Sequence, residues 1–294
     1  MKRALVIGGS GFVGRTLVGR LGPDRAIGTW HTKPLEGMVS FDATQERLPE
    51  LLKQLPADIS HVFVPFGLVN PEQCARDPAG SAEINVASVT RVLDDAFNAG
   101  LIPVFVSTDY VYDGRKISPA EDEPQTPNTE YGRQKAAVER WLTDRNEPWL
   151  ITRLSKVVSG DTTTHSVLGQ WVNDIRQGRP MRSATDQIFC PASVDDIAGA
   201  MIRLAEAGLG GIYHVAGPEP LSRYDLNVML RNAVQAVDES IRPIVEPCSL
   251  RDIPFLEARP LNTSLSTEKL RTAIAWPFQS MSGLCQKIAK SEFA

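Results

Sequence analysis

The fold is decided by the stretch Ala4-Leu5-Val6-Ile7-Gly8-Gly9-Ser10-Gly11-Phe12-Val13-Gly14. Its first four residues form a short, continuous apolar run, which is typical of a strand that a parallel sheet buries on both faces. Glycines follow at positions 8, 11 and 14, and apolar side chains then recur at helical spacing up to Leu21. This order of buried strand, glycine-rich turn and helix predicts the first unit of an α/β fold.

Strand and helix patterns keep alternating through the first half of the chain. Further short apolar runs, expected as strands, cover 26–30, 39–41, 61–66, 102–107 and 149–153. Longer amphipathic segments, expected as helices, cover 46–55, 81–98 and 131–145. Elements of these lengths predict βαβ units with right-handed crossovers. We therefore expect an α/β fold with a Rossmann-like, doubly wound parallel sheet.

The alternation loosens after about Lys156, which indicates a second, smaller unit. Helices are expected over 167–177, 194–207 and 226–237, a sheet-closing strand over 211–215, a candidate strand over 242–245, and a proline-interrupted loop over 249–264 before two short helices. Because one sheet cannot take in all these segments, we expect a smaller α/β C-terminal substrate lobe. The expected boundaries are 1–156 and 189–216 for the domain that holds the parallel sheet, and 157–188 and 217–294 for the lobe.

Size, charge and cysteine spacing narrow the class of protein. A chain of 294 residues can bury a substantial core. The net charge is −4 and no run of Lys and Arg occurs, so we expect a small-molecule substrate and no nucleic-acid partner. Widely spaced cysteines predict reduced thiols, with neither a disulfide framework nor a zinc site. They are Cys74, Cys190, Cys248 and Cys285, and the histidines His31, His61, His165 and His214 form no metal set either.

The apolar run at the N-terminus is too short for a signal peptide, because Gly8 and Gly9 interrupt it and no small-residue cleavage site follows. No apolar stretch approaches the roughly 20 residues that span a bilayer. We therefore expect a soluble, cytoplasmic protein without a membrane partner.

The glycine-rich turn is a candidate dinucleotide-binding site. Glycines at this spacing allow a tight turn and the close approach of main chain to a pyrophosphate. The helix that starts at once supplies free N–H groups and a partial positive charge. We expect the cofactor contacts of this loop at Gly8, Ser10, Gly11, Phe12, Val13 and Gly14. The alternative is a glycine-rich turn that serves only packing.

The end of the second expected strand indicates which dinucleotide binds. An acid there accepts from a ribose 2′-hydroxyl and repels a 2′-phosphate. Here the residues are Trp30, His31, Thr32 and Lys33, and the donors and charge of the last three favour NADPH over NADH. Asp42, after the third strand, is expected at the adenine edge. The alternative for His31, Thr32 and Lys33 is a solvated loop, and the alternative for Asp42 is a simple turn residue.

Tyr131 and Lys135 are four residues apart within an expected helix. That spacing places both side chains on one face, one turn apart. An ammonium beside a phenol lowers the pKa of the phenol, so we expect Tyr131 to act as a proton donor near neutral pH. The alternative is an amphipathic surface helix on which the pair is incidental.

Motifs spread over nearly the whole chain support the chemical interpretation. They are the glycine motif 8–14, the runs 107–114 (Ser-Thr-Asp-Tyr-Val-Tyr-Asp-Gly) and 131–135 (Tyr-Gly-Arg-Gln-Lys), Asp186-Gln187 with Pro191, and the runs 194–198, 212–217 and 259–265. With these motifs the sequence resembles the extended short-chain dehydrogenase/reductase superfamily, and in particular the dTDP-4-dehydrorhamnose reductase family. The glycine and Tyr/Lys motifs are common to the superfamily, whereas 107–114 and 259–265 are more specific to this family.

The resemblance implies a nicotinamide cofactor and the reduction of a ketone on a nucleotide-linked sugar, as in carbohydrate biosynthesis. It carries the catalytic roles over to Thr108, Tyr131 and Lys135. Tyr131 would give a proton to the carbonyl oxygen as hydride arrives, and Thr108 would hydrogen-bond that oxygen. Lys135 would hold the nicotinamide ribose and keep Tyr131 acidic, which also makes both residues cofactor contacts. The alternative for Thr108 is a strand-end hydroxyl that caps main chain.

Two segments depart from the family pattern. An Asn-Ala-Ala-like run usually follows the fourth strand, where this chain has Pro65-Phe66-Gly67, which are expected beside the nicotinamide. An aromatic residue commonly stands at the position of Lys156, in the sugar pocket. A lysine there suits a more acidic substrate. The alternative is that this position has diverged from the family without a role in substrate binding.

The remaining contacts are expected around the catalytic threonine and in the C-terminal loop. Arg259 suits a pyrophosphate because guanidinium matches phosphate oxygens, and a surface ion pair is its alternative. Asp109 and Tyr110 have a structural turn as their alternative. Asn85 is expected to steady main chain or water near Lys135, or only to satisfy its own burial. The expected substrate contacts are Val69, Thr108, Asp109, Tyr110, Lys156 and Arg259.

Three functions fit these motifs, and the first is favoured. It is an NADPH-dependent reductase of a nucleotide-linked 4-keto sugar, as a monomer or a homodimer. A nucleotide-sugar epimerase or dehydratase would keep its hydride on a tightly held NAD and tends to carry the acid that is missing after Trp30. A cofactor-binding regulatory subunit, related to the methionine adenosyltransferase beta subunit, would need no turnover, and the intact Thr108/Tyr131/Lys135 set argues against it.

Overall fold

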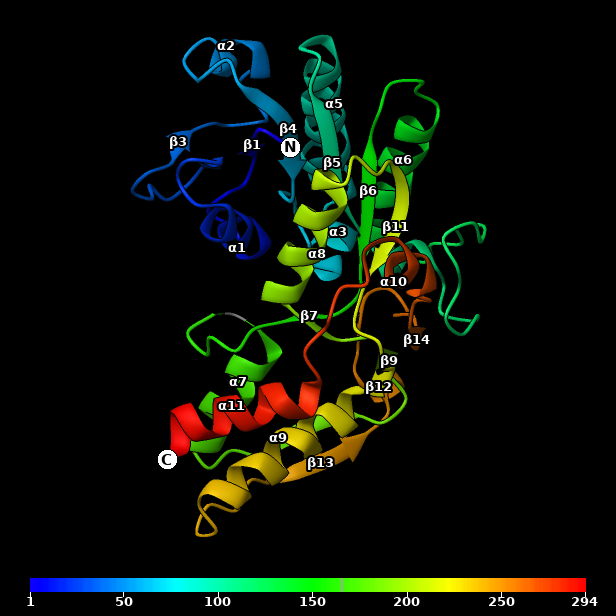
Figure 1. Ribbon diagram of the computed structural model, residues 1–294. Helices are drawn as coiled ribbons and strands as arrows, with labels where there is room; N and C mark the ends of the chain where they lie inside the picture. Colours follow the sequence, from blue (N-terminus) through cyan, green and yellow to red (C-terminus); the bar gives the residue numbers. More distant parts are fainter. Residues whose placement is uncertain (165) are drawn as a thin grey trace.

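A seven-stranded parallel sheet forms the larger part of the structure, a computed structural model that describes residues 1–164 and 166–294 (Figure 1). Its strands are β1 (Arg3–Val6), β2 (Ala26–Trp30), β3 (Val39–Ser40), β4 (Ile59–Val64), β5 (Ile102–Thr108), β6 (Leu150–Leu154) and β11 (Gly211–Val215). They lie in the order β11-β6-β5-β4-β1-β2-β3. The expected doubly wound sheet is confirmed, because the chain winds outward from β1 in both directions.

The strand order reverses between β1 and β4, which are parallel neighbours at the centre of the sheet. In open sheets of this kind, ligands bind in the crevice outside the carboxyl ends of the strands at such a switch point. The fold therefore places a binding crevice directly after β1, where the glycine-rich turn begins.

Helices cover both faces of the sheet, because its strands send alternate apolar side chains to opposite sides. Val6 and Val104 belong to the core on one face. The helices on that face are α1 (Phe12–Leu21), α8 (Val194–Glu206) and α10 (Glu268–Ile274). Leu5 and Phe105 belong to the opposite core. The helices there are α2 (Leu48–Leu52), α5 (Val89–Asn98) and α6 (Glu130–Thr143).

The helix expected over 81–98 is confirmed, but residues 83–88 within it form a π-helical turn. The chain forms α3 (Pro71–Arg76), and then α4 (Pro78–Ala82), the π-helical turn η1 (Glu83–Ser88) and α5 without a break between them. Proline begins both short helices, since the first helical N–H has no partner that proline could remove. The π-helical turn holds Asn85 fully buried, and such turns recur at functional sites.

The C-terminal lobe lies below the sheet in Figure 1 and packs helices around its own core, which contains Trp171 and Leu230. Its helices are α7 (Val167–Arg176), α9 (Arg223–Val237) and α11 (Met281–Phe293). Its strands are β8 (Met181–Ala184), which pairs with β13 (Val245–Cys248), and β12 (Leu221–Ser222), β9 (Ile188–Phe189) and β14 (Asn262–Thr263), which form another small sheet.

Short elements complete the chain and correct two expected boundaries. They are β7 (Val157–Val158) paired with β10 (Ala192–Ser193), and the 3₁₀ turns η2 (Asp109–Val111) and η3 (Leu250–Asp252). The candidate strand over 242–245 is wrong, because pairing with β8 places the strand at 245–248. Helix α9 begins three residues earlier than expected, since Ser222 and Asp225 form a capping box at its start.

Each of the four cysteines is a free thiol, as expected, and three of them are buried. Across the described part of the chain, every helix is too short or too polar to cross a membrane.

A buried ion pair between Arg153 and Glu139 ties α6 to the middle of the sheet. Their side chains are 2% and 1% exposed, and Arg153 Nη2 lies 2.7 Å from Glu139 Oε2. Ser107 on β5 donates a hydrogen bond to the same carboxylate. Arg153 also donates to the Tyr112 hydroxyl at 2.5 Å. These contacts fix the helix relative to β5 and β6.

We expect Glu139→Gln to lower the free energy of unfolding by about 3–5 kcal/mol, because it leaves the Arg153 guanidinium buried without a counter-charge. Urea denaturation followed by circular dichroism measures the change. Glu147→Gln, at an exposed position, is the matched control and should shift stability by less than about 0.5 kcal/mol. A Glu139→Gln protein as stable as the wild type would refute the structural role of the pair.

Candidate active site

A cavity of about 980 Å³ opens at the carboxyl ends of the sheet strands and continues to the lobe. It brings together every predicted site residue except Lys33, which is exposed and outside its lining. The predicted residues that line it are Gly8, Ser10, Gly11, Phe12, Val13, Gly14, His31, Thr32, Asp42, Pro65, Phe66, Gly67, Val69, Thr108, Asp109, Tyr110, Tyr131, Lys135, Lys156 and Arg259.

The glycine-rich loop is closed tightly at the start of α1. A Cβ on Gly14 would lie 2.1 Å from the carbonyl oxygen of Gly8, so no larger residue fits there. The Gly8 N–H donates to Thr29 Oγ1 at 3.0 Å, which ties the loop to β2. Gly11 precedes the helix without a side chain to cap it, so the first N–H groups of α1 are free for an anion. Thr29 was not predicted, although its place in a buried strand is a usable signal.

The end of β2 carries a weak charge pair at the cavity wall. His31 Nε2 lies 3.3 Å from Asp42 Oδ2. A hydrogen bond from the Thr44 hydroxyl is the main cause that lowers the pKa of Asp42, and His31 adds to it. An ionised Asp42 therefore shares this corner with His31 and Thr32. The contact of Lys33 with a 2′-phosphate stays a prediction.

The loop Pro65-Phe66-Gly67 is held against α6 by Asn85. The Leu68 N–H donates to Asn85 Oδ1 at 2.7 Å, and Asn85 Nδ2 donates back to the Leu68 carbonyl at 2.9 Å. Asn85 Nδ2 also donates to Gln134 Oε1 on α6 at 2.8 Å. Gly67 has a φ of +147°, and a Cβ on it would lie 2.8 Å from Asn85 Oδ1. The glycine that departs from the family pattern is thus required by the Asn85 clamp.

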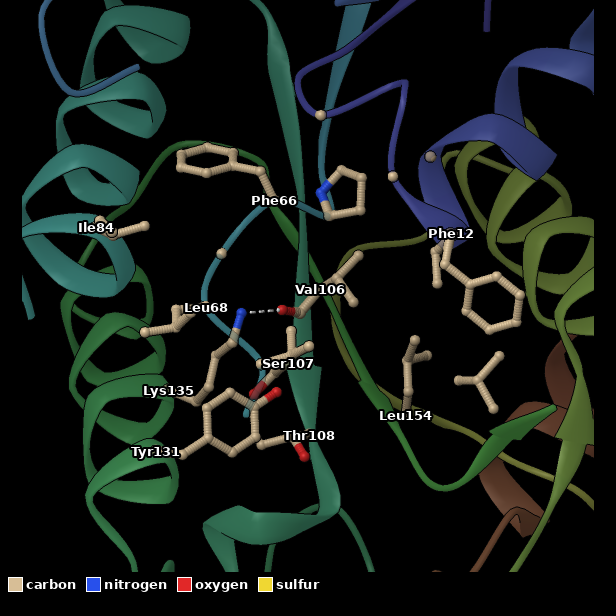
Figure 2. Close-up of a pocket in the computed structure, with 18 of the residues that line it drawn as sticks. Phe12, Phe66, Leu68, Ile84, Val106, Ser107, Thr108, Tyr131, Lys135 and Leu154 are labelled. Atoms are coloured by element: carbon tan, nitrogen blue, oxygen red, sulfur yellow. Dashed lines mark hydrogen bonds between the residues drawn. The ribbon is translucent and has the colours of Figure 1, made fainter. Parts of the chain in front are cut away.

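Thr108, Tyr131 and Lys135 meet at the end of β5, as Figure 2 shows. Thr108 is the last residue of β5, and the other two lie one turn apart on α6. All three are less than a tenth exposed. Helix α6 starts at this depth because Thr129 caps it, with its Oγ1 accepting from the Gly132 N–H at 3.2 Å.

The expectation that Lys135 lowers the pKa of Tyr131 is wrong for this structure. Burial raises the pKa of Tyr131, and a hydrogen bond with Thr108 opposes that rise only in part. Burial also lowers the pKa of Lys135 to about 8. The Lys135 ammonium points to the Val106 carbonyl, 2.9 Å from Nζ, rather than to the phenol (Figure 2). Because both groups are shielded from water, the charged form of each is less favoured than it would be in solvent.

Asp109 and Tyr110 extend the site from Thr108 towards the lobe. Thr108 Oγ1 donates to Asp109 Oδ1 at 2.9 Å. Burial raises the pKa of Asp109 to about 6, against hydrogen bonds from Thr263, Thr108 and Ser155. The Tyr110 ring meets the Tyr131 ring edge-on, with centroids 5.9 Å apart. Ser155 and Thr263 were not predicted, because they come from the end of β6 and from the distant short strand β14.

Arg259 forms the ion pair that was its alternative role, but its side chain is only 12% exposed. Its Nη2 lies 3.1 Å from Glu72 Oε1, and its guanidinium stacks on Phe255 at 4.4 Å. Its buried Nε has no hydrogen-bond partner among the described residues. The side chain as a whole lines the cavity.

Among the described residues, no three His, Cys, Asp or Glu side chains lie close enough together to hold a metal ion. His165, one of the histidines in the sequence, lies outside the described residues.

Comparisons with known proteins show what this chain is similar to. The family model described as "RmlD substrate binding domain" matches residues 1–291. The chain is 28% identical over 284 residues to the "Probable low-salt glycan biosynthesis reductase Agl14" of Haloferax volcanii, covering 91% of this chain and 90% of that protein. It is 28% identical over 291 residues to the dTDP-4-dehydrorhamnose reductase of Aggregatibacter actinomycetemcomitans, covering 93% of each.

Another relative and a solved structure extend the comparison. The methionine adenosyltransferase 2 subunit beta of Xenopus tropicalis is 26% identical over 288 residues, covering 92% of this chain and 81% of that protein. The structure of dTDP-4-dehydrorhamnose reductase from Bacillus anthracis in complex with NADP has a TM-score of 0.83, with 99% of this chain and all of that chain covered. At 19% identity, this likeness concerns the fold alone.

We expect Gly67→Ala to destabilise the protein by about 1–3 kcal/mol, because the new Cβ meets Asn85 Oδ1 and the positive φ strains any side chain. Thermal unfolding measures the effect. Gly19→Ala is the matched control, since its Cβ meets nothing within 4 Å in the middle of α1, and it should be neutral or stabilising. If both variants melt like the wild type, the clamp does not constrain this loop.

Proposed function

Because this chain belongs to the RmlD substrate binding domain family, we propose that it reduces a ketone on a nucleotide-linked sugar with hydride from NADPH. The observation that carries the proposal is one continuous cavity, which holds both the glycine-rich loop and the side chains of Thr108, Tyr131 and Lys135. The Aggregatibacter relative is named for a reduction of this class. The nucleotide cofactor is proposed to bind to 1–156 and 189–216, with the sugar against the lobe, 157–188 and 217–294.

The residues at the start of the cavity fit a dinucleotide. The free N–H groups at the start of α1 suit a pyrophosphate, and the tight packing of Gly14 on Gly8 would hold the loop in shape around it. Pro65 and Phe66 would line the nicotinamide end. Lys135 would hold its ribose by turning from the Val106 carbonyl. When bound, the cofactor supplies the hydride, and the Bacillus anthracis protein of the same fold was solved with NADP.

Tyr131 holds the proton that the reaction needs. Burial raises its pKa, so the hydroxyl stays protonated across the physiological range until a base arrives. The substrate oxygen becomes that base as it gains negative charge, and the proton then moves from Tyr131 Oη to it. Thr108 Oγ1 would donate a hydrogen bond to the same oxygen by turning its proton away from Asp109 Oδ1. Lys135, with a pKa of about 8, is mostly charged at neutral pH and favours this transfer once it faces the phenol.

A second candidate function is a binding subunit without turnover. The specific observation that favours it is the likeness to the methionine adenosyltransferase 2 subunit beta of Xenopus tropicalis over 92% of this chain. Both functions need the glycine-rich loop, but only the reductase needs the proton on Tyr131. An epimerase or dehydratase is disfavoured because the residue after β2 is His31 rather than an acid.

Replacement of the proton donor separates these functions. We expect Tyr131→Phe to lower kcat by at least about a hundredfold, because general acid catalysis is lost, while the Kd for NADPH changes less than about threefold. NADPH oxidation with a panel of nucleotide-linked keto sugars gives kcat, and fluorescence titration gives Kd. Tyr224→Phe, a tyrosine on α9 outside the cavity, is the matched control and should retain activity. Full activity in Tyr131→Phe would remove this residue from the chemistry, and an inert panel for the wild type would favour the binding subunit.

Cofactor choice is tested in the same titration. We expect the wild type to bind NADPH more tightly than NADH, and Lys33→Glu to weaken NADPH by about tenfold with little effect on NADH, because a negative charge then faces the 2′-phosphate. Lys290→Glu, an exposed lysine on α11, is the control and should change neither affinity. A wild-type preference for NADH would overturn the cofactor assignment, and equal effects of Lys33→Glu on both would make Lys33 a bystander.

A further inference from the structure

Lys156 is held close to the predicted catalytic residues. It follows β6 by two residues, and the last residue of β6, Leu154, is paired with Thr108. Its carbonyl accepts a hydrogen bond from the Ala192 N–H at 3.0 Å. The main chain at Lys156 is therefore held both by β6, which precedes it, and by this hydrogen bond. Its half-buried side chain lines the same cavity as Thr108 and Tyr131. A cation therefore stands beside the place proposed for the reacting sugar.

The Lys156 ammonium has no dedicated counter-charge. Within the described part of the chain, it makes no side-chain hydrogen bond and no ion pair. Burial lowers its pKa, and the positive charge of Arg223 adds to that effect. Asp109 is the acid that opposes these effects, and Thr108 already donates to its carboxylate. A lysine left in this condition is unfavourable unless a ligand supplies an anion.

The charged side chains around Lys156 carry more positive than negative charge. Three cations, Lys156, Arg223 and Arg259, act at this end of the site, against the two acids Asp109 and Glu72. Glu72 is engaged by Arg259, and the Asp109 carboxylate already accepts a hydrogen bond from Thr108, so neither acid is dedicated to Lys156. Arg223 stacks on the Trp171 ring at 5.3 Å and has no acid of its own in the described residues. The lobe end of the cavity is thus prepared for more negative charge than the protein provides.

We propose that the sugar of the substrate carries an anionic group, most simply a carboxylate, and that the Lys156 ammonium binds it. The inference rests on the proposed function, since it names the substrate class of that site as an acidic nucleotide-linked sugar. Lys156 is assigned to the sugar rather than to the diphosphate because its acidic neighbour, Asp109, is adjacent to Thr108, which faces the reacting carbonyl. Arg259, which also lines the cavity, is left for the diphosphate.

The test uses stable probes that have no ketone, so that binding is measured without turnover. The matched pair is a nucleoside-diphosphate glucose and the corresponding glucuronate. They differ only at C6 of the sugar, where a carboxylate replaces the hydroxymethyl group. Each is tested with uridine and with thymidine as the nucleoside. The free nucleoside diphosphate is the third arm. Calorimetric titration into the NADPH-loaded protein should give about tenfold tighter binding of the glucuronate than of the glucose compound.

Variants of Lys156 identify the group that reads the carboxylate. Lys156→Gln should abolish the preference for the glucuronate while leaving the affinity for the glucose compound and the free nucleoside diphosphate within about twofold. Lys156→Arg keeps the charge and should keep the preference, which guards against a merely structural loss. Lys287→Gln, an exposed lysine on α11, is the matched control and should behave as the wild type.

The remaining outcomes each decide the matter. Equal binding of the glucose and glucuronate compounds would overturn the inference and leave the proposed reductase intact. A Lys156→Gln protein that loses all three ligands equally would assign Lys156 to the diphosphate and also overturn it. If none of the three binds, both the inference and the proposed function fail, and reduction of a neutral keto sugar without any preference would sink only the inference.

Discussion

The buried ion pair between Arg153 and Glu139 is the constraint on which the site depends. It joins α6, which carries Tyr131, to the adjacent strands β5 and β6. Taking two charges out of water costs about as much as their attraction returns, so such a pair contributes position more than stability. Ser107 binds the same carboxylate one residue before Thr108. A shift of the helix would therefore displace the hydroxyls of Thr108 and Tyr131 relative to each other.

Burial is what sets the charge states in the cavity. It raises the pKa of Tyr131, lowers that of Lys135 to about 8 and raises that of Asp109 to about 6, and in each case it is the largest cause. Burial thus keeps the phenol protonated, as the proposed proton transfer requires. The same loss of water makes the Lys156 ammonium costly, because it has no ion-pair partner among the described residues. This departure from the family pattern therefore bears on the proposed substrate.

Local patterns explain what could be predicted of the fold and the site. The apolar run before Gly8 and the alternation that follows depend on neighbours in sequence, so the sheet, its helices and the glycine loop were predictable. The π-helical turn at Asn85 was not, because it forms around hydrogen bonds to Leu68 and Gln134, which are distant in sequence. The acidity expected of Tyr131 from its spacing to Lys135 was wrong, because spacing places side chains on a face but says nothing of water.

The sequence by itself determined the α/β class, the start of the glycine-rich loop and the residue types that meet at its crevice. These follow from periodicity, from the conformational freedom of glycine and from the rule that parallel strands end at one edge of a sheet. Only the tertiary structure decided that Glu139 pairs with Arg153, that position 67 must be glycine beside Asn85, and that Lys156 has no ion-pair partner in the described ranges 1–164 and 166–294. Desolvation and contacts between distant segments arise only when the chain is packed, so no local pattern of residues encodes them.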